Sequence, residues 1–423
     1  MDCGKTRGTG QDELFAGYAC ADITPPLPFP MAGIAGPKER LAAGVRDPLR
    51  ATCVRLRQGK TEAAILLLDI LIIDGALMAD LREIAQSAGC GNLLAVASHT
   101  HSGPGGTVDG RGTRFFMGRY REDIRRNLLA TVENLLGGAR ADELPVSSVR
   151  HGAADVPGMT MNRRMRGGTV DDRVLALVVE RRGGSPVLLG CASGHPVVVA
   201  FMKPELASAD WPGEVRRRFE ADGFLPLLLP GALGGLNVLF PEMPTAMEDH
   251  LDLIARNATD GLRRAISGAV STSLRLRFSE EDVSFRRAWP PYSGGPPNLA
   301  MRAALSSLLG SFYSRFVAPP EVSVPISVVG IGEAAVTGMP ADFGVVATRT
   351  LRDRLSAAGC ACPLVASHSN GYVGYVHLPD ELDYRPGNEP GFLTYENAMA
   401  WYGRDAGTKL IDAACRQYES IRS

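Results

Sequence analysis

The chain has 423 residues, in which 45 lysines and arginines nearly balance 46 aspartates and glutamates, and its formal net charge is −1. This balance argues against a nucleic-acid-binding protein, because phosphate binding needs a clustered basic surface. Apolar residues make up 45% of the chain, an ordinary value for a globular protein of this length. Disorder and a coiled coil are therefore excluded.

The most apolar stretches do not have the form of membrane spans. The stretch 63–79 contains Asp69 and Asp74, and the stretch 224–240 is broken by Pro226 and Pro230. The first 13 residues carry charges and have no apolar core, so they do not resemble a secretory signal. We expect a cytoplasmic protein without stable membrane insertion.

Apolar runs along the chain predict alternating strands and helices. The N-terminal half is expected to hold strands at 15–21, 51–56, 63–73 and 93–97, and helices at 75–87 and 120–136. Further strands are expected at 174–179, 187–191, 225–229, 274–278, 322–331 and 334–337, and helices at 212–221, 298–311 and 343–358. This order predicts a mixed α/β fold with β-sheets flanked by helices. We expect residues 1–15 to form a polar tail and residues 16–423 to form one domain.

Two of the seven histidines, His99 and His101, follow the predicted strand 93–97. In an extended segment residues two apart point the same way, so both imidazoles can face one cavity. The Gly-Pro-Gly-Gly turn that follows leaves room for a ligand there. A pair of surface loop histidines is the alternative, although loops at strand ends are the usual place for sites.

A third histidine, His195, follows the predicted strand 187–191. Neutral imidazole is a common metal ligand, and three such groups from separate loops can hold zinc with an open position for water. A core or capping role is the alternative for His195. Near the end of the chain, Asp342 precedes a predicted helix, so it can be an acidic ligand or a helix N-cap. The glycine-rich segment 370–375 brings Tyr372 and Tyr375 close to what lies beneath it, or forms a tight turn.

Several segments, in chain order, resemble the catalytic domain of the neutral ceramidase family over about residues 16 to 415. The most specific is Ser-His-Thr-His-Ser-Gly-Pro-Gly-Gly at 98–106. The others are Asp-Ile-Thr-Pro-Pro at 22–26, Asp-Pro-Leu at 47–49, Asn-Arg at 162–163, Gly-His-Pro at 194–196, Asp-Trp-Pro-Gly at 210–213, Gly-Met-Pro-Ala-Asp at 338–342 and Asn-Gly-Tyr-Val-Gly-Tyr at 370–375.

The resemblance implies one zinc ion per chain, held by two histidines, a carboxylate and a tyrosine. By position, the implied metal ligands are His99, His195, Asp342 and Tyr375. It also implies that His101 and Tyr395 are catalytic residues close to the reaction centre.

Two further residues are expected to bind substrate. Arg163 can hold a carboxylate or another anionic group in a bidentate way, with a surface arginine as the alternative. Asn237 stands where the family has its active-site serine.

The chain departs from the family pattern in three ways. The segment 234–238 lacks the family's serine and its aspartate, which Asn237 and Gly235 replace. Asp342 is one methylene shorter than the family's glutamate. The immunoglobulin-like domain that follows the family's catalytic domain is not expected here.

These features predict a zinc-dependent amidohydrolase that cleaves an N-acyl or other small-molecule amide. Metal-activated water needs no serine nucleophile, so the lost serine leaves hydrolysis open. One alternative is zinc-dependent acyl transfer or intramolecular cyclisation in a biosynthetic pathway, which the changed segment 234–238 favours. Another is a catalytically silent binding protein of the same fold. The expected partner is a small-molecule amide and not a nucleic acid, and a homo-oligomer is compatible with the sequence.

Overall fold

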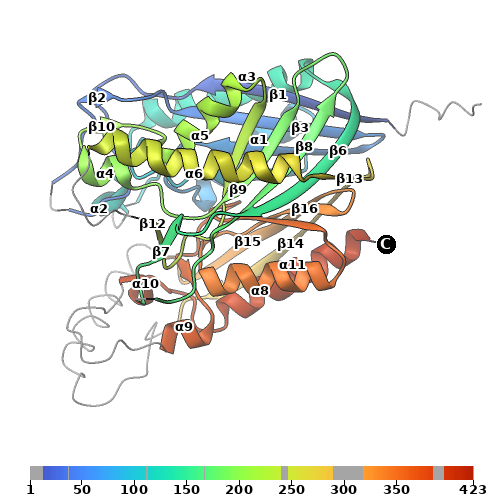
Figure 1. Cartoon of the computed structure of the whole chain (residues 1–423). Helices are drawn as coiled ribbons and strands as arrows, with labels where there is room; N and C mark the ends of the chain where they lie inside the picture. The colour runs from blue at the N-terminus through green and yellow to red at the C-terminus, as the bar shows by residue number, and fades with distance from the viewer. Residues whose placement is uncertain are drawn as a thin grey trace, which may run out of the picture.

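The computed structural model describes residues 13–36, 38–110, 113–165, 167–239, 246–288, 318–383 and 395–422, without the side chains of Asp383, Tyr395 and Ala398. The predicted helix at 298–311 lies outside these residues. Within them the chain forms four layers, with two β-sheets packed face to face and helices on both outer faces (Figure 1).

The larger sheet has nine strands among the described residues, and its two edge pairs, β11–β9 and β4–β5, are parallel. Its other main-path pairs are antiparallel. The strand order is β11 (Leu225–Pro230), β9 (Val187–Ala192), β8 (Arg173–Arg181), β6 (Leu144–Asp155), β1 (Leu14–Asp22), β3 (Arg50–Gln58), β4 (Thr61–Leu68) and β5 (Leu93–Ala97), with β13 (Val270–Thr272) paired to β6.

The smaller sheet packs its inner face on the larger one. Its order is β14 (Leu276–Arg286), β15 (Glu321–Ile331), β16 (Ala334–Gly338) and β18 (Cys362–Ala366), and only the last pair is parallel. The core between the sheets joins Val54 and Leu189 of the larger sheet to Val329 and Leu364 of the smaller one. Burial of such branched side chains is the main stabilising contribution to this arrangement.

Helices cover the two outer faces. On the larger sheet, α1 (Gly75–Ser87) and α3 (Glu122–Ala141) pack over one half, and α5 (Asp210–Ala221) and α6 (Met247–Ser267) pack over the other. On the smaller sheet lie α8 (Val345–Ala357) and α11 (Ala406–Arg422) (Figure 1). Helix α1 illustrates the local cause, because Asp74 caps it by accepting from the Leu77 amide at 2.8 Å, and Leu77 and Leu81 share its buried face.

Short elements complete the described chain. They are β2 (Gly44–Val45), α2 (Arg114–Met117), β7 (Thr160–Asn162), α4 (Val198–Met202), β10 (Leu206–Ala207), β12 (Leu236–Val238), β17 (Asp342–Phe343), β19 (Tyr375–Val376), α9 (Pro379–Asp383) and α10 (Tyr395–Ala398). Among them β12 pairs with β7, and β17 pairs with β19.

The predicted mixed α/β class is confirmed, and α1 and β5 have the predicted bounds. Strand β1 begins at Leu14, so it takes in the last two residues of the segment predicted as a polar tail. The prediction lacked β6, α6, β18 and α11. No helix among the described residues is both long and apolar enough to cross a bilayer.

Candidate metal centre

Four strands, two from each sheet, lead into one buried cluster of imidazoles around a carboxylate. His99 and His101 follow β5, and His195 follows β9. Asp342 follows β16, and His368 follows β18. All five side chains therefore lie beyond the carboxyl ends of strands that have a parallel neighbour, the usual place for ligand sites in α/β proteins.

The centre of the cluster is Oδ1 of Asp342. Three imidazole Nε2 atoms surround it, at 3.1 Å for His368, 3.3 Å for His195 and 3.6 Å for His99. The Nε2 atom of His101 lies 3.2 Å from that of His99. Two overlapping trios of donor atoms are close enough to share an ion, one with His99, His101 and His195 and one with His99, Asp342 and His368.

Backbone carbonyls fix the ring orientation of two histidines. The Nδ1 atom of His99 lies 2.9 Å from the Leu71 carbonyl, and that of His195 lies 2.7 Å from the Leu236 carbonyl. A carbonyl only accepts, so each Nδ1 carries the hydrogen and each Nε2 keeps a lone pair. Both lone pairs therefore belong to the nitrogens nearest Asp342, the arrangement that metal-binding histidines adopt.

Burial keeps these imidazoles neutral. His99, His195 and Asp342 are almost completely inaccessible to solvent. Burial, together with the neighbouring imidazoles, lowers the pKa of His99 and of His101 well below the ordinary value. Burial and the nearby Arg163 lower the pKa of His195. Neutral imidazole is the form that binds metal, so these shifts favour coordination at neutral pH.

The carboxyl group of Asp342 stays ionised. Its burial opposes ionisation, but His368 and His99, when either ring carries a proton, hold its pKa well below the usual range. Its Oδ2 atom accepts from the Tyr372 hydroxyl at 3.1 Å, whereas its buried Oδ1 has imidazole nitrogens beside it but no hydrogen bond of regular geometry to any described residue. A buried carboxylate oxygen without a donor is costly, which makes Oδ1 the atom that lacks a partner here.

The donor set fits a zinc ion. Ligand atoms about 2.0 to 2.1 Å from tetrahedral zinc are separated from one another by about 3.3 Å. The three distances from Asp342 Oδ1 to imidazole nitrogens, 3.1 to 3.6 Å, bracket this value. Lone pairs facing a carboxylate oxygen repel unless a proton or a cation lies between them, so the cluster has the charge pattern of a cation site.

The loops after β5 and β18 contain residues with strained backbone conformations. His99, His368 and Asn370 have positive φ values of 63°, 54° and 57°, which residues other than glycine rarely adopt. The loops also bond across the sheets, because the Ala97 amide donates to the His368 carbonyl at 3.0 Å and the Ala95 amide donates to Asn370 Oδ1 at 2.9 Å. Such strain at buried polar residues is typical of functional sites.

Arg163 reaches from the loop after β7 to the edge of the imidazole cluster. Its Nη2 donates to the Tyr375 hydroxyl at 3.1 Å and lies 3.5 Å from His195 Nε2. Its Nη1 donates to Asn237 Oδ1 at 3.1 Å, and its Nε donates to Glu396 Oε1 at 2.7 Å. The arginine is therefore held on three sides beside the candidate metal ligands.

Glu396 is the hub of a second buried cluster, which we call the arginine cluster: Arg163, Arg164, His377 and Glu396. Its Oε2 atom lies 2.9 Å from Arg164 Nη1 and 3.1 Å from His377 Nε2. Burial opposes the charge of Glu396, but Arg163 and His377 lower its pKa strongly. Burial also opposes the charge of His377, whose pKa is nevertheless raised by the neighbouring carboxylates of Glu381 and Glu396.

The structure brings together most of the residues predicted from sequence. His99, His101, His195 and Asp342 share the cluster, and Arg163, Asn237 and Tyr375 form its rim. Tyr395 begins α10, and its side chain lies outside the described part of the chain.

Two details of the site differ from the sequence analysis. Asp342 is not a helix N-cap, because Gly344 occupies that position of α8 and Asp342 lies in β17, opposite Tyr375 of β19. His368 was missed, although it follows an apolar run as His99 and His195 do. The signal was hidden because the short strand β18, with a proline at 363, was not predicted.

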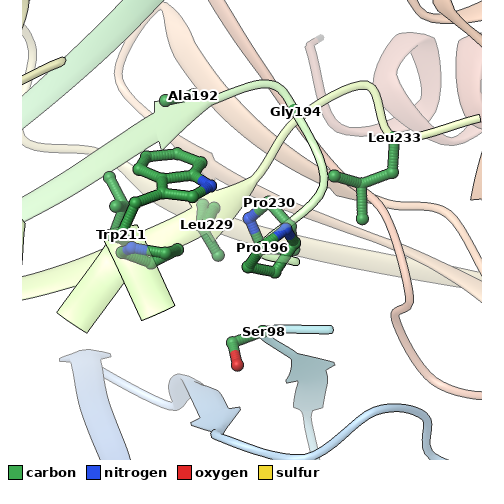
Figure 2. A pocket seen from close by; sticks show the side chains of 10 residues that line it. Ser98, Ala192, Gly194, Pro196, Trp211, Leu229, Pro230 and Leu233 are labelled. Carbon is green, nitrogen blue, oxygen red and sulfur yellow. The ribbon is translucent and has the colours of Figure 1, made fainter. Parts of the chain in front are cut away.

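A small, mostly apolar cavity lies next to the segments that carry His99 and His195. Figure 2 shows Ser98 on one side of it and the segment from Ala192 to Pro196 with Trp211 on the other. The two loops are also bonded directly, because the His101 amide donates to the Pro196 carbonyl at 3.1 Å. The apolar contacts around this cavity thus support the residues that flank His99 and His195.

A larger groove opens at the surface beside His101. Its lining includes the apolar side chains of Met31, Ile34, Phe115 and Phe116. Arg40 also lines it and donates through Nη2 to the His101 carbonyl. Arg40 thus links the groove to the backbone that carries a cluster histidine.

Comparison with known proteins identifies the fold. No protein-family model matches the sequence, and no curated protein does. The neutral ceramidase from Pseudomonas aeruginosa has a similar structure, with a TM-score of 0.78 at 17% sequence identity over 97% of this chain and 75% of that one. A ceramidase complexed with C2 gives a TM-score of 0.77 at 16% identity, again over 97% and 75% of the two chains. The chain therefore has a ceramidase-like fold.

Proposed function

We propose that this protein is a zinc-dependent amidohydrolase that cleaves an N-acyl or other small-molecule amide. The observation that carries the proposal is the convergence of three imidazole Nε2 atoms on the unpartnered Oδ1 of Asp342, at separations suited to tetrahedral zinc. The ceramidase-like fold supports amide hydrolysis as the reaction class. One zinc ion per chain and a cytoplasmic location belong to the same proposal.

We assign His99, His195, Asp342 and Tyr375 to the zinc ion. Bound there, zinc would polarise an amide carbonyl and lower the pKa of a water molecule toward neutrality. The two histidines are prepared for this role by their Nδ1 hydrogen bonds, which leave the Nε2 lone pairs available.

His101 is proposed to move the proton. Its ring lies against His99 and is kept neutral by burial, so at neutral pH it can accept a proton from water and deliver it to the leaving amine. Its Nδ1 is buried next to Gly33 and makes no hydrogen bond to any described residue. Tyr395 is proposed as a second donor near the reaction centre.

Arg163 is proposed to bind an oxygen of the substrate that carries or develops negative charge. Its guanidinium is fixed by Glu396 and Asn237, so it needs little reorganisation to act there. Asn237, which replaces the serine of ceramidases, supports Arg163 and borders the same space. The surface groove beside His101 offers apolar contacts for an acyl group and cationic ones from Lys38, Arg40 and Arg114.

The test is a panel of amides that varies the acyl chain and the amine: ceramide in detergent, N-acyl amino acids and short acyl amides. Mass spectrometry follows both products in water enriched in oxygen-18. The proposal expects a free carboxylic acid that carries the label, and no such product from the Asp342→Ala variant. Ligation or cyclisation without hydrolysis would favour the synthetic alternative, and binding of unchanged compounds by zinc-loaded protein would favour a binding protein.

A further inference from the structure

We propose that His368 is a metal ligand, in addition to the residues assigned above. This inference rests on the proposed function, because it needs the same metal ion and uses the same convergence on Asp342 Oδ1. It concerns a residue that has no place in the ligand set of two histidines, a carboxylate and a tyrosine.

Two hydrogen bonds fix the backbone of His368. Its amide donates to the Ala341 carbonyl at 3.1 Å, and its carbonyl accepts from the Ala97 amide at 3.0 Å. These bonds tie it to the chain next to Asp342 on one side and to the chain next to His99 on the other. Movement of His368 away from either residue would therefore break one of these hydrogen bonds.

The ring is fixed as well. It stacks between His99, at a centroid distance of 3.8 Å, and Tyr372, at 5.4 Å. Its Nε2 lies 3.1 Å from Asp342 Oδ1, closer than the nitrogens of His99 and His195. The stacked rings place the Nε2 edge of His368 next to Asp342 Oδ1.

Neither nitrogen of this completely buried ring has a hydrogen bond of regular geometry to any described residue, and Nε2 faces Asp342 Oδ1 at 3.1 Å. Leaving a buried polar group without a well-aligned partner is unfavourable, and an ion bound at Asp342 Oδ1 would lie within reach of Nε2. The same ion would satisfy Oδ1, so a single addition completes both groups.

The positive φ of His368 adds an independent argument. A value of 54° is strained for histidine, and glycine or asparagine would adopt it at lower cost. His99, already assigned to the ion, has the same kind of backbone with φ of 63°. Retaining an imidazole at such a position is expected where the side chain itself is needed.

A third imidazole ligand would also compensate for the shorter carboxylate side chain of Asp342. The side chain of Asp342 is one methylene shorter than that of a glutamate. An ion bound to it would therefore lie closer to the strand ends, where His368 is. Coordination requires the rings of His99 and His368, which stack at an interplanar angle of 16°, to tilt apart, since both lone pairs must point at one ion.

The test measures zinc affinity and coordination directly. Purified chain and variants are stripped of metal, titrated with zinc in competition with a chromophoric chelator, and separately loaded with cobalt(II) for visible spectroscopy. The variants are His368→Ala and His368→Asn, since asparagine tolerates the positive φ and keeps the loop unstrained. His151→Ala, a histidine of β6 outside the cluster, is the matched control, and His195→Ala reports loss of an assigned ligand.

We expect both His368 variants to bind zinc at least about 100-fold more weakly than the parent, because the large binding free energy of a zinc site is shared among few ligands. The cobalt bands should shift in both, and His151→Ala should match the parent. Zinc affinity within about threefold of the parent, with unchanged cobalt bands in a folded His368→Asn variant, would overturn the inference while His195→Ala still lost the metal. A parent that binds neither ion would defeat the proposed function as well.

Discussion

The imidazole cluster around Asp342 and the arginine cluster around Glu396 are adjacent, similarly buried and similarly rich in charge, yet they are completed differently. Each oxygen of Glu396 faces donors of the chain itself, at 2.7 to 3.1 Å. Oδ1 of Asp342 faces three nitrogens, of which two carry lone pairs, and has no hydrogen bond to any described residue. The carboxylate of one cluster is paired with arginines of the chain itself, and the carboxylate of the other has the pattern of a site completed by a cation.

This difference suggests a division of labour. The arginine cluster holds Arg163 rigid, and Arg163 in turn contacts Tyr375 and approaches His195. The imidazole cluster supplies free donor atoms. A paired network thus fixes Arg163 beside the imidazole cluster.

The largest effect should follow removal of the ion. Stripping the protein with a chelator is expected to reduce amide hydrolysis by more than about 100-fold and to lower the melting temperature, because a ligand bound only to the folded state stabilises it. Added zinc should restore both readings. Activity that survives complete removal of metal, confirmed by elemental analysis, would remove the distinction between the two clusters.

Replacing Arg163 should damage catalysis without emptying the metal site. For Arg163→Ala, kcat/KM is expected to fall about 100-fold, the usual loss when one preorganised donor to a charged oxygen is removed. Zinc content should stay at the parental level. Arg163→Lys serves as the control for charge, and recovery of full activity by lysine would argue against a need for the fixed guanidinium.

Breaking the arginine cluster at its hub should mainly cost stability. Glu396→Gln leaves Arg163 and Arg164 buried without their counter-charge, which typically costs about 3 to 5 kcal/mol in unfolding free energy. Urea unfolding monitored by circular dichroism gives this value. A loss below about 1 kcal/mol would mean that the two arginines find other partners.

The pH dependence of stability should reflect the same hub. The folded pKa of Glu396 is below its unfolded value, so its contribution is fully present above about pH 4.5 and is lost as the pH falls further. Below pH 4.5 the parent should lose about 1.4 kcal/mol per pH unit relative to Glu396→Gln. Parallel stability curves for the two proteins down to pH 3 would contradict this.

The smallest effect is expected at Tyr372. Tyr372→Phe keeps the ring that stacks on His368 but removes the 3.1 Å hydrogen bond to Asp342 Oδ2. Outer partners of metal ligands typically contribute about 10-fold or somewhat more to metal affinity. The chelator competition described above measures it, and an unchanged affinity would show that the bond does not orient the carboxylate.

Much of the architecture could be predicted from apolar runs. Strands buried on both faces, such as β5 and β9, are continuous runs of apolar residues and were predicted within a residue of their bounds. Strand β6 was missed because it alternates buried and exposed residues and includes polar ones such as Arg150 and His151. Helix α6 was missed because its buried stripe is interleaved with charged residues.

Residues of the candidate site could be predicted only where they belong to a recognisable sequence motif. The histidine string and the glycine-rich segments resemble ceramidase motifs, so His99, His195 and Asp342 were found. His368 has no such motif, and the arginine cluster depends on contacts between residues more than 200 positions apart, which local sequence patterns do not encode. Contacts of this kind become visible only after the two sheets are packed together.

The central claim is that the buried imidazole cluster binds zinc. The most direct measurement is elemental analysis of zinc per chain in protein purified without added metal, with the His195→Ala variant purified alongside. We predict close to one zinc ion per chain in the parent and much less in the variant. A parent without zinc or another transition metal, even after reconstitution, would contradict the account and reduce the ceramidase likeness to a likeness of fold.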